Sequence, residues 1–115
     1  MSAPNEGDII SFKPELDARG QELDGAKPWL VVSSNGYNQS SKLAMVCPII
    51  SLSTNISAAN LAAVSLPANC GVNGEVLTFQ LQTIDWQTRK AVIVGKVPVA
   101  TLKSVHRNLR MCLAL

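Results

Sequence analysis

The chain has 115 residues, of which 47% are hydrophobic and 16% are charged, and its formal net charge is +2 at pH 7. A chain of this length and composition can bury a full core without metals or disulfides, so we expect one compact domain over residues 1–115. The net charge is too small to indicate a nucleic-acid partner by itself. No apolar run approaches the roughly 18 residues that span a bilayer, and the N-terminus lacks a secretory pattern. We therefore expect no membrane partner and a cytoplasmic location.

The charges are unevenly distributed along the chain. The N-terminal loop region is rich in acidic residues, whereas the last third carries a basic excess. Such an asymmetry would suit a polyanion or an acidic partner, and an ordinary solvated helix face explains it equally well.

The cysteines indicate packed thiols rather than a ligand set. Cys47, Cys70 and Cys112 are odd in number and match no zinc or redox spacing. We expect them to be reduced and mostly buried, and we expect neither a structural metal nor a cofactor.

Short apolar runs separated by turn signals predict about five or six strands. The runs at residues 7–12 and 28–34 flank a charged loop, and an Asn-Gly pair within residues 34–38 favours a hairpin-like reversal. The returning strand, residues 42–50, is almost continuously apolar, which suggests burial on both faces. Further strands are predicted within residues 60–67, at the start of 75–86, and at 90–97.

The pattern changes to a helical period after Pro98. Leu102, Val105 and Leu109 recur at helical spacing, which predicts an amphipathic C-terminal helix covering one side of the sheet. The predicted fold class is mainly β with a C-terminal helix, as a small, strongly bent antiparallel sheet or partly open barrel.

The common catalytic templates are missing from the sequence. It contains no phosphate loop, nucleophile elbow or zinc signature. Its one histidine, His106, lies within the predicted helix, so we expect a surface or helix-face role. Polar residues at the loop mouths remain as candidates for ligand binding, although ordinary solvated loops would also contain them. These residues are Glu22, Lys27, Ser51, Ser53, Asn55 and Gln80.

Several motifs occur in the order and near the spacing that is typical of one family. They are GDIISF at 7–12, GQELDGAKPWLVVSS at 20–34, YN at 37–38, VCPIIS at 46–51 and QLQTIDW at 80–86. No single motif is specific, but the ordered set covers nearly the whole chain. The sequence thereby resembles the MazF/PemK (Kid) toxin family.

The resemblance implies a fold, a reaction and partners. The fold would be a small SH3-like antiparallel β-barrel of the CcdB/PemK type, acting as a homodimer. Members of the family are toxins of type II toxin–antitoxin systems that cleave single-stranded mRNA without a metal, and an acidic antitoxin neutralises them. In this reaction the ribose 2′-hydroxyl attacks the adjacent phosphorus, which requires a base, an acid and a group that stabilises the phosphoryl charge.

The resemblance also implies which residues are catalytic. Glu22 matches the loop glutamate of the family. Lys27 replaces its arginine, which keeps the positive charge but loses the planar fork that holds a phosphate bidentately. The threonine at the strand end falls on Ile50, and the following serine is kept as Ser51. Ser51 could replace the missing hydroxyl if the strand end reorients it.

At two further positions that are characteristic of the family, the residue type differs here. Phe79 and Leu77 stand where relatives carry an acid and an arginine. Glu22 could serve as a general base or as an ion-pair partner of a loop cation such as Arg19 or Lys27. We expect RNA contacts from Arg19, Ser53, Asn55 and Gln80.

Two segments have a simpler structural interpretation. Within residues 83–86, the threonine and aspartate suit the capping of a short turn, while the isoleucine and tryptophan can pack. Trp29 could stack on a base, but a core or dimer-interface position is more common for tryptophan.

Three functions fit these observations. The leading hypothesis is an mRNA-cleaving toxin of a toxin–antitoxin pair. The alternative is a catalytically weakened protein that binds RNA or its antitoxin without cleavage. A gyrase poison of the CcdB type ranks last, because the matching loop and the Gln-x-x-Thr-Ile-Asp segment are typical of the ribonuclease branch.

Overall fold

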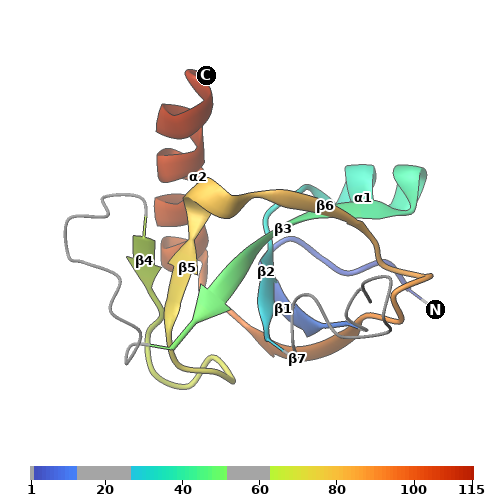
Figure 1. Ribbon diagram of the computed structural model, residues 1–115, viewed down its shortest axis with the longest axis horizontal. Coiled ribbons are helices and arrows are strands. Elements are labelled where there is room, and N and C mark those ends of the chain that lie inside the picture. Colours follow the sequence, from blue (N-terminus) through green and yellow to red (C-terminus); the bar gives the residue numbers. More distant parts are fainter. Residues whose placement is uncertain (1, 13–26, 52–62) are drawn as a thin grey trace, which may run out of the picture.

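The computed structural model describes residues 2–12, 27–51 and 63–115, which form a strongly curved antiparallel sheet with two helices (Figure 1). The longer helix, α2, runs along one side of the sheet, and the shorter α1 lies at the opposite end. This arrangement confirms the predicted mainly β fold with a C-terminal helix. The elements are β1 (Asp8–Ser11), β2 (Trp29–Val31), α1 (Asn35–Ser41), β3 (Leu43–Ile50), β4 (Ala63–Ser65), β5 (Glu75–Leu77), the 3₁₀ helix η1 (Thr78–Gln80), β6 (Gln82–Asp85), β7 (Val92–Lys96) and α2 (Val99–Leu113).

The sheet has seven strands, and β3 is its centre. The strand order is β4-β5-β3-β2-β1-β7, and β6 also pairs with β3. On one edge of β3, β6 pairs with its first half and β5 with its last residues, while η1 joins the two. Among the described strands, β4 and β7 are edges that do not pair with each other, so the sheet is bent but open.

Both faces of the sheet are buried, each under its own cluster. Cys47 and Ile49 of β3 belong to the helix-side cluster, which also contains Val105 of α2. Ala44 and Val46, which alternate with them, belong to the tryptophan cluster on the other face. The prediction that this strand is buried on both faces is therefore confirmed. The tryptophan cluster consists of Ile10, Phe12, Trp29, Val31, Ala44, Val46, Ile84 and Trp86.

The predicted hairpin turn at the Asn-Gly pair is wrong, because these residues begin helix α1. Ser34 is the N-cap of this helix, and its side chain accepts a hydrogen bond from the backbone N–H of Tyr37 at 3.2 Å. Asn38 is fully buried, donates through Nδ2 to the Pro4 carbonyl at 2.9 Å, and accepts from the Trp86 indole at its own carbonyl at 3.1 Å. N-capping and these tertiary contacts together favour the helix over a local turn. β2 and β3 are still antiparallel neighbours.

The C-terminal helix is fixed to the sheet by its histidine. His106 Nε2 lies 2.9 Å from the carbonyl oxygen of Val32 and 3.6 Å from Glu6 Oε2. The half-buried ring thus connects α2 with the end of β2 and with the N-terminal segment. This is the helix-face role expected from the sequence.

None of the described helices has the length and apolarity needed to cross a membrane.

Candidate functional site

At one end of the sheet, Lys27 lies between residues that continue β1 and end β3. β1 and β2 pair Ile10 with Trp29, and continuing this register by two residues beyond the strands places Phe12 opposite Lys27. The register of β2 and β3 likewise places Lys27 opposite Ile50. The hydrogen bond from Ile49 N to Pro28 O, at 3.0 Å, confirms that this pairing extends beyond β2.

The same row continues across β3 to a carboxylate. Ile50 pairs with Glu75 of β5, and Glu75 pairs with Ser65 of β4. Ser65 Oγ donates to Glu75 Oε1 at 3.4 Å. Residues directly opposite each other in an antiparallel pair share a face, so these side chains form one row on the face of the tryptophan cluster. We call Phe12, Lys27, Ile50, Glu75 and Ser65 the cross-strand row.

Two cations flank a pair of aromatic rings at this row. The Lys27 Nζ lies 5.2 Å from the centroid of the Trp29 ring, and the Trp29 and Phe12 centroids are 5.3 Å apart with planes inclined by 32°. On the Phe12 side, the Arg89 Cζ lies 4.6 Å from the ring centroid. Both distances are within the range of cation–π attraction. Trp29 is only 1% exposed, which confirms the expected core position and leaves its ring no room for a base.

Arg89 extends from a turn that Asp85 organises after β6. Asp85 Oδ1 accepts from the backbone N–H groups of Gln87 and Thr88 at 3.1 and 3.0 Å, and its Oδ2 accepts from Thr88 Oγ1 at 2.9 Å. The Arg89 backbone N–H donates to the Asp85 carbonyl at 3.0 Å. The hydrogen bonds from Thr88, first its backbone and then its side chain, lower the pKa of Asp85. The predicted capping role of this aspartate is confirmed, whereas Thr83 lies within β6.

Ser51 follows the last residue of β3 and is exposed. Within a strand, successive side chains point to opposite faces, so it is Ile50 that shares the face of Lys27. Because Ser51 lies beyond the strand, this alternation no longer fixes its direction. The structure therefore places an aliphatic side chain opposite the candidate catalytic cation and a hydroxyl one residue away.

The other predicted site residues are divided between described and undescribed parts of the chain. Gln80 is exposed at the end of η1, which contacts the edge of β3 opposite to β2. Lys27 and Ser51 thus lie at the same end of the sheet, and Gln80 lies alongside β3 on its other edge. Four predicted residues lie outside the described residues, namely Arg19, Glu22, Ser53 and Asn55.

Sequence reasoning missed Arg89 and Glu75 as site residues. In the sequence, Arg89 is one of several basic residues near the C-terminus. Its position beside Phe12 depends on the turn that Asp85 forms. Glu75 alternates with the buried Val76, which marks it as outward-facing on β5. Its position two strands from Lys27 depends on the strand order, which the sequence pattern does not contain.

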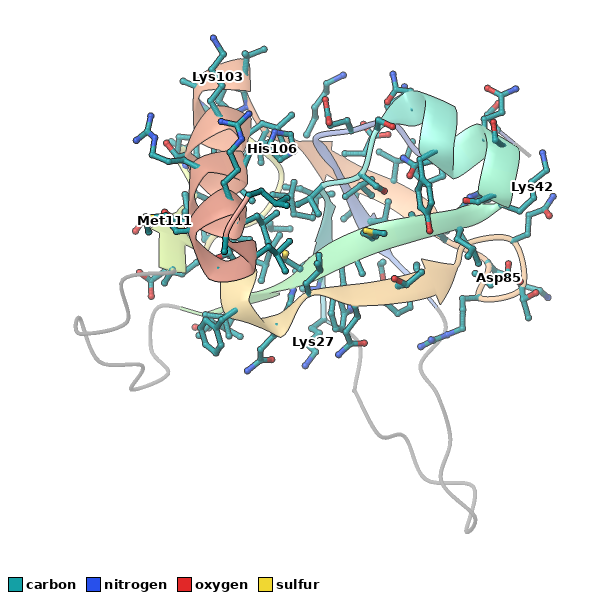
Figure 2. The ribbon with its side chains drawn as sticks, turned by 90° about the horizontal axis from the view of Figure 1, so that it is seen from above. Lys27, Lys42, Asp85, Lys103, His106 and Met111 are labelled. Atoms are coloured by element: carbon teal, nitrogen blue, oxygen red, sulfur yellow. The ribbon has the colours of Figure 1, made fainter. Side chains whose placement is uncertain are left out.

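Within the described residues, the cysteines do not form a second candidate site. Burial, followed by the Coulombic effect of Cys112, raises the pKa of Cys47 to about 12, so this thiol is not a nucleophile near neutral pH. Cys47 and Cys70 are buried as predicted, and Cys112 is exposed. No group of three or more His, Cys, Asp or Glu side chains that could hold a metal ion occurs within the described residues. Figure 2 shows Lys27 well away from Lys103 and His106 of α2.

Comparison with known proteins identifies the family. A profile of PemK-like, MazF-like toxins of type II toxin–antitoxin systems matches residues 5–113. A MazE–MazF complex from Deinococcus radiodurans contains a chain that is 29% identical over 98% of both chains, with a TM-score of 0.83. MazF from the same organism is 28% identical over 100% of both chains, with a TM-score of 0.79. An endoribonuclease from a mycobacterial species, solved with its cognate antitoxin, shares the fold at 22% identity over 100% of this chain and 97% of its own, with a TM-score of 0.75. Among curated protein sequences, none matches significantly. The chain therefore belongs to the PemK-like, MazF-like toxin family of type II toxin–antitoxin systems.

Proposed function

We propose that this toxin is a metal-independent endoribonuclease that cleaves single-stranded mRNA in the cytoplasm. The observation that carries the proposal is the position of Lys27, held over the Trp29 ring at the end of the cross-strand row. The relative from a mycobacterial species is named an endoribonuclease, and its fold is the same. A fixed cation at a loop mouth is what phosphoryl chemistry without a metal requires.

The reaction would proceed by transfer within the RNA itself. The 2′-oxygen attacks the adjacent phosphorus, the bond from phosphorus to the 5′-oxygen breaks, and a 2′,3′-cyclic phosphate and a 5′-hydroxyl result. A base takes the proton of the 2′-hydroxyl, and an acid gives a proton to the leaving 5′-oxygen. We assign the base to Glu22, stabilisation of the phosphoryl charge to Lys27, and a hydrogen bond to the phosphoryl oxygen to Ser51.

The backbone around Lys27 is suited to hold its ammonium group in place. Pro28 fixes the backbone torsion after the lysine, and its carbonyl accepts the hydrogen bond from Ile49 N. Trp29 is anchored in the core and attracts the ammonium through its ring face. Preorganisation of this kind reduces the reorganisation that would otherwise accompany charge development.

Sequence choice would come from residues around this centre. We assign contacts with unstacked bases and with the RNA backbone to Arg19, Ser53, Asn55 and Gln80. Recognition of single-stranded RNA through loops that read splayed bases is common in RNA-binding proteins.

We further propose that the toxin is a homodimer that an acidic antitoxin neutralises. Large apolar side chains at the end of α2 and on η1 are exposed by 44% to 87% of their surface, as expected for a surface that another chain covers. They are Phe79, Met111, Leu113 and Leu115. The adjacent face of α2 carries Lys103, Arg107 and Arg110, which would attract acidic segments. The solved relatives include complexes of MazF with MazE.

The alternative function is RNA or antitoxin binding without cleavage. One observation favours it: the side chain directly opposite Lys27 is the aliphatic Ile50. A site with a lysine in place of a guanidinium, and an aliphatic side chain directly opposite it, can bind a phosphate without stabilising its transition state.

The test is incubation of the purified protein with a long single-stranded RNA, followed by mapping of the new ends. Lys27→Ala should abolish cleavage while the melting temperature stays unchanged, and Lys103→Ala on α2 should cleave like the wild type. RNA of varied sequence that stays intact at every salt concentration would contradict the nuclease proposal. If the wild type binds the RNA without cutting it, the alternative function is the correct one.

A further inference from the structure

We propose that Arg89 is a second RNA-binding cation, and that Arg89 and Lys27 hold different phosphates of one RNA strand on either side of the Phe12–Trp29 pair. This inference deepens the proposed function and depends on it for the identity of the ligand. The inference adds a residue from the turn between β6 and β7 to the RNA site proposed around Lys27. The chemical class of the ligand is the phosphodiester backbone of a single-stranded nucleic acid.

A continuous series of side-chain contacts links the two cations. Lys27 lies over Trp29, Trp29 packs against Phe12, and Arg89 lies over Phe12. Both rings belong to the buried tryptophan cluster, with Phe12 only 8% exposed, so they form a fixed spacer rather than a mobile one. The two cations are therefore held at a set separation on the same face of the sheet.

Several hydrogen bonds hold the turn that carries Arg89. Its backbone N–H is bonded to the Asp85 carbonyl, and the Asp85 carboxylate holds the two preceding residues through three hydrogen bonds. The turn closes with a further bond, from Ala91 N to the Trp86 carbonyl at 3.0 Å. Trp86 is itself 1% exposed within the tryptophan cluster. An arginine fixed at both its backbone and its side chain loses little conformational entropy when it binds a ligand.

The planar guanidinium group of Arg89 is suited to bind a phosphate. The Arg89 guanidinium lies over the Phe12 ring with its Nη2 buried, so a phosphate would meet its Nε and Nη1 donors, which lie in the plane of the group. These two nitrogens can bind phosphate oxygens while the guanidinium stays over the ring. A bidentate contact of this kind is the one that Lys27 cannot make. The arginine would thus restore planar phosphate recognition near a centre that carries a lysine.

A linear ligand fits this arrangement better than a compact anion. A single phosphate would need both cations to point at one spot, but the two aromatic rings stand between them. The evenly spaced phosphates of a nucleic-acid strand can meet both. Phosphate contacts position a strand without reading its sequence, so Arg89 should act equally on every base sequence.

The experiment measures binding and cleavage separately. The binding probe is a short fluorescent single strand of mixed sequence with 2′-O-methyl riboses, which lacks the attacking hydroxyl and cannot be cleaved. Fluorescence anisotropy at several salt concentrations gives the dissociation constant and its salt slope. Arg89→Gln is compared with Arg89→Lys and with Lys96→Gln, which changes an exposed lysine opposite Asp8, at the far end of β1 from Phe12. Melting temperatures are recorded for all variants.

We expect Arg89→Gln to weaken binding about tenfold and to lower the salt slope by about one phosphate contact, equally for all probe sequences. Arg89→Lys should recover the slope and part of the affinity, and Lys96→Gln should change neither. In cleavage assays, Arg89→Gln should raise KM more than it lowers kcat.

Several results would overturn the inference. A purely structural role for Arg89 would lower the melting temperature of Arg89→Gln and leave its salt slope at the wild-type value. Competition by polyglutamate as effective as that by RNA would identify an acidic peptide as the ligand instead. If the wild type cleaves RNA and Arg89→Gln binds normally, only this inference fails. If the wild type neither binds nor cleaves RNA, the proposed function fails with it.

Discussion

Lys27 lies directly opposite Ile50 across the β2–β3 register, so an aliphatic side chain faces the candidate catalytic cation. A hydroxyl at this position would donate to a phosphoryl oxygen held by the lysine. We therefore predict that Ile50→Thr raises kcat for RNA cleavage about tenfold, since donors aimed at developing charge are among the largest contributions to catalysis. The measurement is single-turnover cleavage of a defined RNA substrate.

Ile50→Val is the matched control for this variant, because valine has nearly the shape of threonine but no hydroxyl. It should cleave at the wild-type rate. Equal rates for the threonine and valine variants would show that the hydroxyl of Ser51 already fills the role, or that the row is not catalytic.

Lys27→Arg should raise kcat/KM about tenfold, because a guanidinium can hold the phosphate with two parallel hydrogen bonds. Its planar group could also lie over the Trp29 ring, as that of Arg89 lies over Phe12. Steady-state kinetics on the same RNA will measure the change, with Lys103→Arg on α2 as the control. A decrease in kcat/KM would mean that the site is shaped around the ammonium group.

The Asp85 turn should loosen in acid. Hydrogen bonds from Thr88 hold the pKa of Asp85 below its ordinary value of 3.8. A carboxyl with a lowered folded-state pKa contributes stability that is fully present above its unfolded pKa and is lost as pH falls through the folded one. We predict an NMR titration midpoint for Asp85 below 3.8 in the wild type.

Thr88→Val removes the side-chain donor and should move this midpoint upward, toward the ordinary value. The amide signal of Thr88 should follow the same titration in the wild type, because its N–H donates to Asp85 Oδ1. A wild-type midpoint at or above the ordinary value would contradict the assignment of these hydrogen bonds.

Asn38 should be among the most sensitive polar positions for stability. It is 0% exposed and donates to the carbonyls of Pro4 and Ser33 at 2.9 and 3.2 Å. Asn38→Ala removes these donors and leaves buried carbonyls without them, which should lower the free energy of unfolding by about 2 kcal/mol. Urea denaturation measures the change. Gln39→Ala, at an exposed position of the same helix, should stay within about 0.5 kcal/mol of the wild type.

The sequence predicts the elements of this fold better than their junctions. The two-sided apolarity of β3 predicts a strand with a cluster on each face, and the spacing of Leu102, Val105 and Leu109 predicts α2. The hairpin prediction at the Asn-Gly pair fails because Ser34 caps a helix and Asn38 is held by Pro4, which is distant in the sequence. Local turn chemistry alone cannot anticipate such contacts.

The candidate site, like the fold, is predicted by the sequence only in part. The resemblance predicts Lys27 and Ser51, and the structure places both at one end of the sheet. The cross-strand neighbours of Lys27 depend on the register of separate strand pairs, and a shift of one residue would replace every one of them. Glu75 and Arg89 could therefore be found only from the structure.

The pairing of Phe12 with Lys27 has a consequence for how this toxin can diversify. Residues 13–26 connect two points that face each other across neighbouring strands, so β1 and β2 pair without them. Insertions in a connection between adjacent ends change folding free energy only slowly with length. Under the RNA contact proposed for Arg19, exchanging this segment between relatives would change the base preference and keep the proposed phosphate-binding residues Lys27 and Arg89, so the two properties could evolve separately.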